Sequence, residues 1–188
     1  MRTLLCAGAV LLTLLSGTVA AKEVAGVQVA EASRVDHIAL VLNGAGVRTK
    51  FFVKVYVGAL YLPKREAQAA TILAADGPWS VYMHFLHSEV EAKKLVGAWN
   101  DGFEANLADA DRAQLAERIA AFNALFRTVL RGEVIRIDYS PVAGTQVAIQ
   151  NEVRGTIPGA DFARAVLGIW LGDKPADAGL KRAMLGSE

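Results

Sequence analysis

Cysteine is almost absent from this sequence, because Cys6 stands alone among 188 residues. A single cysteine excludes a disulfide within the chain, and no later residue can serve as a thiolate nucleophile or a cysteine metal ligand. Phosphate-binding loops are missing too, since no Gly-rich segment ends in Lys-Ser or Lys-Thr, and Gly44-Ala45-Gly46 lacks the third glycine of a dinucleotide site. No serine lies in a nucleophile elbow.

The three histidines do not form a metal-binding pattern. His37, His84 and His87 lack the spacing and the acidic neighbours of a metal site. His84 and His87 are three residues apart in a predicted strand, so they point to opposite faces. The sequence therefore predicts no metal and no cofactor.

Neither sign of charge predominates in the chain. It carries 20 basic and 19 acidic residues, a net charge of +1. This balance argues against nucleic acid or an anionic membrane as a partner. The sequence leaves the oligomeric state open.

The N-terminus has the order of parts of a secretory signal peptide. Arg2 is followed by an apolar run over residues 4–15 and by small residues over 16–21. The alternative is a membrane anchor, but the run is shorter than the roughly 20 residues that span a bilayer. We therefore predict a signal peptide over residues 1–21 and one exported domain over 22–188, in the periplasm, without stable membrane insertion.

Alternating side chains predict strands over residues 36–43, 50–62 and 79–87. We expect Gly44-Ala45-Gly46 to break the first strand. In the second strand, one parity is expected to form a core face: Phe51, Val53, Val55, Val57, Ala59 and Tyr61. The other parity mixes polar and apolar groups and is expected to face a cleft: Phe52, Lys54, Tyr56, Gly58 and Leu60.

Helical periodicity follows, with a short helix predicted over residues 67–75. Ser88 and Glu91 form a capping-box pattern that predicts a helix start. A second long helix is expected from Asp109, with an apolar stripe reaching Val129. Residues 133–140 and 145–154 are typical of a hairpin, and helices are expected from Pro158 and over 179–185. This order predicts an α+β fold, an antiparallel sheet with helices on one side and an apolar cleft between the layers.

Arg48 is the candidate for chemistry in this cleft. It follows the glycine segment and precedes a long strand. Its planar guanidinium can bind a carboxylate or an enolate through two hydrogen bonds. Tyr56, on the mixed face of the next strand, adds a hydroxyl donor. The alternative is a solvated arginine on a turn.

Two separated segments resemble signatures of the chalcone isomerase family. The first comprises residues 43–48 (NGAGVR) and 52–62 (FVKVYVGALYL). The second comprises residues 155–159 (GTIPG), 167–175 (LGIWLGDKP) and 180–186 (LKRAMLG). The chain is similar to the bacterial chalcone isomerase-like branch over residues 36–186. The resemblance implies an open-faced β-sandwich, in which a large antiparallel sheet carries a layer of helices on one face.

The resemblance carries site residues over one position at a time. The key arginine of the family matches Arg48. The threonine that polarises the substrate ketone in plant enzymes falls on Tyr56, and the active-site tyrosine falls near His87. A threonine-methionine pair at the end of the cleft falls on Ile169 and Trp170. Arginine alone is retained, and one lost donor is worth about 3 kcal/mol of an enolate-forming barrier.

These departures favour binding over catalysis. The resemblance implies an amphipathic anion such as a fatty acid as the ligand, with Arg48, Tyr56, His87, Ile169 and Trp170 as the binding residues. An intramolecular isomerase or lyase acting on an enone is the alternative, with Arg48 and Tyr56 as the catalytic residues. A structural or partner-binding protein with a filled cleft is a third interpretation.

Overall fold

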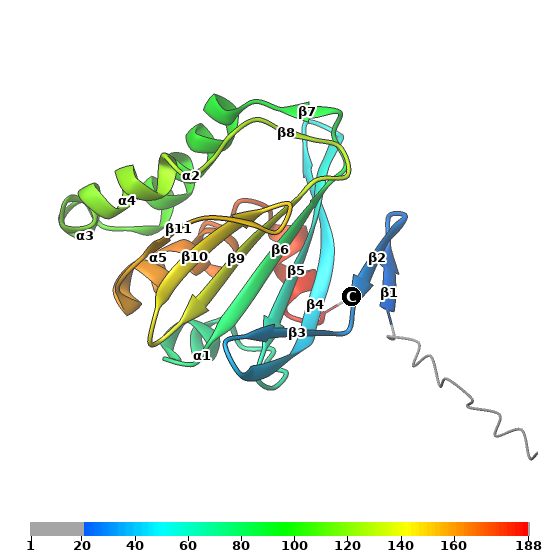
Figure 1. Ribbon diagram of the computed structural model, residues 1–188, viewed down its shortest axis with the longest axis horizontal. Helices are drawn as coiled ribbons and strands as arrows, with labels where there is room; N and C mark the ends of the chain where they lie inside the picture. The colour runs from blue at the N-terminus through cyan, green and yellow to red at the C-terminus, as the bar shows by residue number, and fades with distance from the viewer. Residues whose placement is uncertain (1–20, 188) are drawn as a thin grey trace, which may run out of the picture.

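The computed structural model describes residues 21–187, so the predicted signal peptide lies outside the described residues except for Ala21. Seven strands form one antiparallel sheet in the order β11-β10-β9-β6-β5-β4-β3 (Figure 1). Their bounds are β3 Ala32–Val35, β4 Ile38–Lys50, β5 Val53–Leu62, β6 Trp79–Phe85, β9 Val134–Ser140, β10 Gly144–Ile149 and β11 Glu152–Ile157.

Two small ribbons accompany this sheet. One pairs β1 (Ala21–Val24) with β2 (Val27–Ala30), and the other pairs β7 (Glu89–Val90) with β8 (Val129–Leu130). The helices gather on one face of the large sheet, which confirms the predicted α+β sandwich (Figure 1). They are α1 Ala69–Ala74, α2 Ala92–Asn106, α3 Asp109–Gln114, α4 Ala116–Asn123, α5 Ala160–Leu171 and α6 Ala178–Met184. Within residues 21–187, every helix is too short or too polar to cross a membrane.

The expected break at Gly44-Ala45-Gly46 is wrong, because β4 runs through all three residues. The glycines serve the packing of α6 instead. A Cβ atom at Gly44 would meet the backbone carbonyl oxygen of Ala183, and one at Gly46 would meet the Cβ of Ala183. Asn43 fixes the same contact by donating from Nδ2 to the carbonyl oxygen of Met184 at 2.7 Å. The two sequence signatures therefore meet where α6 lies on β4.

Several other boundaries differ from the predictions. The capping box at Ser88 is wrong, because Glu89 and Val90 form β7 and Glu91 is itself the N-cap of α2. The long helix expected from Asp109 divides into α3 and α4 at Leu115 and ends at Asn123. The expected strand 145–154 is two strands, because Gln150 and Asn151 form a turn with positive φ angles. Strands β1, β2 and β3 were not predicted.

From Tyr56 to Leu62 both faces of β5 are buried, each in a different core. The mixed face, with Tyr56 and Leu60, packs under the helices in the main core. The face expected to form the core, with Val57, Ala59 and Tyr61, lies in a smaller core against β1 to β4. The expectation of a core face is confirmed for Val57, Ala59 and Tyr61, which the N-terminal strands cover. It is wrong for Phe51 and Val53, which are 85 % and 43 % exposed, because Phe51 lies in the turn before β5 and Val53 begins that strand.

Candidate functional site

Arg48 and Tyr56 are direct neighbours across the β4–β5 ladder. The Arg48 guanidinium carbon lies 5.7 Å from the centre of the Tyr56 ring, which is cation–π geometry. Arg48 Nε is buried and has no hydrogen-bond partner among residues 21–187. An unsatisfied buried donor on a charged group is costly, and a ligand oxygen would remove that penalty.

Tyr56 links the sheet to the helical layer. Its side chain is 1 % exposed, and its hydroxyl oxygen accepts a hydrogen bond from Trp170 Nε1 at 2.9 Å. These residues lie 114 positions apart in the chain, on β5 and α5. Burial raises the pKa of Tyr56, while Arg48 and Trp170 act to lower it. The hydroxyl therefore stays protonated at neutral pH and keeps its own proton to donate.

Aromatic side chains surround this pair. Trp170 packs edge-on against Trp99 at 5.7 Å, and Tyr56 packs against Phe85 at the same ring separation. Trp99 also contacts Phe122 and Phe126. All of these rings are less than a tenth exposed. The space between sheet and helices beside Tyr56 is therefore occupied by the protein's own side chains.

Trp99 of α2 was not among the predicted site residues. Its Nε1 is buried without a hydrogen-bond partner in the described chain. It is thus a second orphan donor close to Trp170. Helical periodicity predicts that such a residue is buried, but it does not show which neighbour its ring nitrogen faces.

The remaining predicted site residues lie apart from Arg48. Ile169 is buried, and its side chain packs beside Gly102 of α2. His87 is exposed after β6, where its backbone N–H donates to the carbonyl oxygen of Val55 at 3.1 Å. The contacts of the structure therefore bring together Arg48, Tyr56 and Trp170, while Ile169 lies inside the helical layer.

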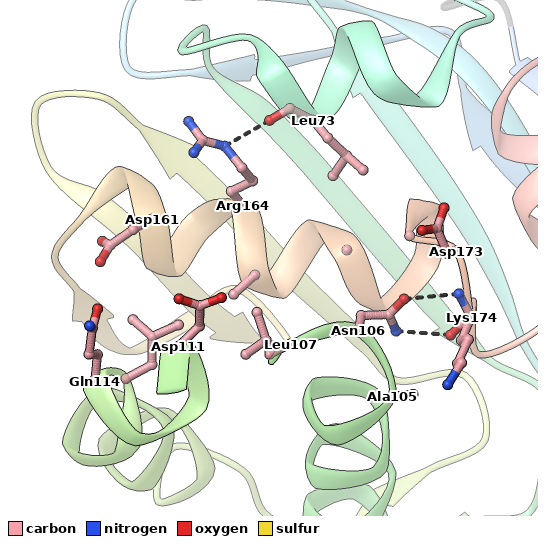
Figure 2. Close-up of a pocket in the computed structure, with 14 residues that line it drawn as sticks. Leu73, Ala105, Asn106, Leu107, Asp111, Gln114, Asp161, Arg164, Asp173 and Lys174 are labelled. Atoms are coloured by element: carbon pink, nitrogen blue, oxygen red, sulfur yellow. Dashed lines mark hydrogen bonds between the residues drawn. The ribbon is translucent and has the colours of Figure 1, made fainter. Parts of the chain in front are cut away.

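Five of the best-formed hollows over residues 21–187 are lined by other residues. The largest, of about 560 Å³, lies between α2, α3 and α5, away from the sheet (Figure 2). Its side chains are mixed in charge, with Asp111, Asp173 and Arg164 on its walls, and Asn106 bonded to the backbone of Lys174 (Figure 2). An apolar hollow of about 350 Å³ lies between the end of β5, α1 and the start of β6.

The three contacting side chains differ in the protons that they can donate. A guanidinium is always protonated, a neutral phenol donates, and an indole only donates. Arg48 and Tyr56 can therefore donate to an anion, whereas the single N–H of Trp170 already donates to Tyr56. None of the three side chains accepts a proton at neutral pH. Proton abstraction from a substrate would need another group.

The sequence pattern of the chalcone isomerase-like family matches residues 21–186. The chain belongs to this family. No curated protein matches the sequence significantly. Among solved structures, the chalcone isomerase-like fold is shared with the crystal structure of an Arabidopsis thaliana fatty-acid binding protein. The two chains are 15 % identical with a TM-score of 0.66, and the match covers 85 % of this chain and 92 % of the plant protein.

Proposed function

We propose that this chalcone isomerase-like protein binds a small amphipathic carboxylate and catalyses no reaction on it. Arg48 is the anchor for the carboxylate, and the Tyr56 hydroxyl supports it. The observation that carries the proposal is the buried Arg48 Nε without a partner, beside a buried neutral phenol. A carboxylate oxygen is the ligand group that satisfies such a donor best.

The absence of a base from the contacting set favours binding over isomerisation. Closure of an enone needs several donors that stabilise the developing enolate, and Arg48 alone is retained of the family's catalytic residues. A carboxylate, in contrast, arrives with its full negative charge. Because the similar plant structure is named a fatty-acid binding protein, we propose a fatty acid as the ligand class.

An acyl tail needs room that the aromatic cluster occupies. Trp170 and Trp99 must turn away for the tail to lie between sheet and helices. Each methylene buried contributes about 0.8 kcal/mol, so a long chain can offset the repacking of two indoles. We further propose that the protein acts after export to the periplasm, as the N-terminal sequence indicates.

Calorimetry on delipidated protein with dodecanoate and palmitate tests the proposal. We expect binding by the wild type and at least a tenfold loss in Arg48→Ala, because a charge-assisted pair is removed. Tyr56→Phe should weaken binding less. Arg34→Ala, on exposed strand β3, is the matched control. Equal binding by the Arg48 variant would refute the anchor, and enzymatic loss of the 2′-hydroxychalcone absorbance would refute the non-catalytic role.

A filled cleft is the second candidate, and the packed aromatic cluster favours it. In that case the protein has a structural or partner-binding role, and Arg48 serves the cation–π contact with Tyr56. Wild-type protein would then bind neither fatty acid. A Trp170→Ala variant that gains binding would show that the indole closes a site that the fold still contains.

A further inference from the structure

The turn between β4 and β5 carries two phenylalanines that pack on nothing. Phe51 is 85 % exposed and Phe52 is 102 % exposed. Every residue from Thr49 to Lys54 is exposed, and Val53 adds another apolar side chain. The turn lies at the end of the sheet away from α1 (Figure 1). The fold therefore gains almost no burial from this pair of rings.

The backbone of this turn is unfavourable for phenylalanine. Because Lys50 pairs with Val53, the loop has two residues, and both have positive φ angles of 48° and 64°. Such turns favour Asn or Gly, since left-handed backbone crowds the Cβ atom. Two other two-residue turns with positive φ angles at both positions have a favoured residue at the second position, Gly26 after Ala25 and Asn151 after Gln150. Two aromatic residues at this turn thus lower stability without a packing benefit.

Basic side chains flank the exposed rings. Arg48, Lys50 and Lys54 fall within seven residues that contain no acidic side chain. The Lys50 ammonium lies 6.0 Å from the centre of the Phe51 ring. Asp177 contacts the same end of the hairpin, where its carboxylate accepts a hydrogen bond from the backbone N–H of Thr49, next to Lys50. The net charge of the whole chain is close to zero and therefore does not reveal this local positive cluster.

We propose that this hairpin tip docks on an anionic lipid bilayer, with Phe51 and Phe52 inserted at the headgroup boundary. Paired aromatic rings among lysines fit that boundary, because the rings bury in the acyl region while the ammonium groups stay with lipid phosphates. A two-residue tip is a narrow wedge, which suits lipid better than the broad face of a protein partner. The protein would bind reversibly at the bilayer surface through this tip, and the rest of the fold would stay unchanged.

Docking does not depend on the fatty-acid site, although the two are close in the chain. Arg48 lies three residues before Phe51 on the same hairpin. A carboxylate ligand leaving a membrane would therefore meet the tip first and Arg48 next. Weaker ligand binding in Tyr56→Phe, which removes no charge from the hairpin, would leave docking intact, so the two proposals fail separately.

Vesicle sedimentation of the signal-free protein tests the docking. We use phosphatidylcholine vesicles with and without phosphatidylglycerol. The wild type should sediment with the anionic vesicles. The double variant Phe51→Asn/Phe52→Gly, which places favoured turn residues in the same backbone, should bind at least about tenfold less while remaining folded. Lys50→Gln/Lys54→Gln should lose about fivefold per lysine on anionic vesicles alone.

Val142→Asn is the matched control. Val142 is 95 % exposed in the turn after β9, at the opposite end of the sheet, and its replacement should leave sedimentation unchanged. Equal sedimentation of wild type and the double phenylalanine variant would overturn the proposal. Failure of the wild type to bind either vesicle would also overturn it and would leave a protein partner as the occupant of the tip.

Discussion

The tip of the β4–β5 hairpin and the strand that follows it use aromatic residues in opposite ways. Tyr56 is buried, bonded to Trp170 and surrounded by rings, whereas Phe52, four residues earlier, is fully exposed in strained backbone. Tyr56 on β5 joins the helical layer to the sheet. Phe51 and Phe52 at the exposed tip contribute nothing to that packing. Aromatic side chains only four residues apart therefore differ completely in burial.

Trp170→Ala should produce the largest change, because it deletes a fully buried indole and opens a cavity at the centre of the main core. We expect the free energy of unfolding to fall by about 3–5 kcal/mol, measured by guanidinium denaturation. Trp170→Phe keeps most of the volume and removes the hydrogen bond to Tyr56, so it should cost less. A change below 1 kcal/mol in the alanine variant would show that the cluster is loosely packed.

Gly44→Ala tests the close contact between β4 and α6. The added methyl group meets the carbonyl oxygen of Ala183, which is backbone and cannot move aside cheaply. We expect a loss of about 1–3 kcal/mol in the free energy of unfolding. Gly97→Ala in α2 is the control, since a Cβ there meets nothing within 4 Å and should stabilise the helix. If both variants respond alike, close docking of α6 is not the reason for Gly44.

The double variant Phe51→Asn/Phe52→Gly should raise stability at the exposed tip. Relief of left-handed strain is expected to add about 1 kcal/mol to the free energy of unfolding. Thermal and chemical unfolding measure this change. Destabilisation instead would mean that the two rings pack on the protein in solution, which would remove the contrast between the tip of the hairpin and the strand that follows it.

The smallest effect is expected from Asp161→Asn, at the surface of the helical layer. Arg118 donates to both carboxylate oxygens at 2.6 and 2.7 Å and lowers the pKa of Asp161 to about 2. Because this pKa is lower in the folded protein, the ionised carboxylate stabilises the fold at pH values above its ordinary pKa of 3.8. That stabilisation is lost as the pH falls toward 2. Because the Asp161 side chain is 60 % exposed, we expect Asp161→Asn to lower the free energy of unfolding by less than about 1 kcal/mol.

Unfolding curves of wild type and Asp161→Asn at neutral and acidic pH measure that contribution. The two proteins should differ at neutral pH and converge near pH 2. A difference that persists at low pH would assign it to the geometry of the first turn of α5 rather than to the charge.

The sequence predicted much of the fold through periodicity. Alternation located β5 and β6, and the spacing of apolar residues located α2 and α5. The family resemblance was confirmed across nearly the whole chain. The predictions failed at the glycines of residues 44–46 and at the polar capping-box pattern of Ser88. Gly44 and Gly46 were interpreted as a break, because no local pattern reveals that α6, more than 130 residues later, needs their missing side chains.

The candidate site was predicted only in part. Arg48, Tyr56 and Trp170 were all named from the sequence, but Arg48 was expected on a turn, whereas it lies in β4 opposite Tyr56. The hydrogen bond from Trp170 to Tyr56 was not predicted, because the direction of side chains between two layers depends on how α5 lies on the sheet. The orphan nitrogen of Trp99 was missed for the same reason.

By itself, the sequence determined the chemistry available to this protein: one cysteine, no phosphate loop, and a single arginine beside a tyrosine-bearing strand. Local rules also set the order of strands and helices, because side-chain alternation and helical periodicity act over a few residues. Only the tertiary structure decided which aromatic residues fill the cleft and which protrude. That choice depends on contacts between segments far apart in the chain, and it separates Trp170 in the core from Phe51 and Phe52 at the tip.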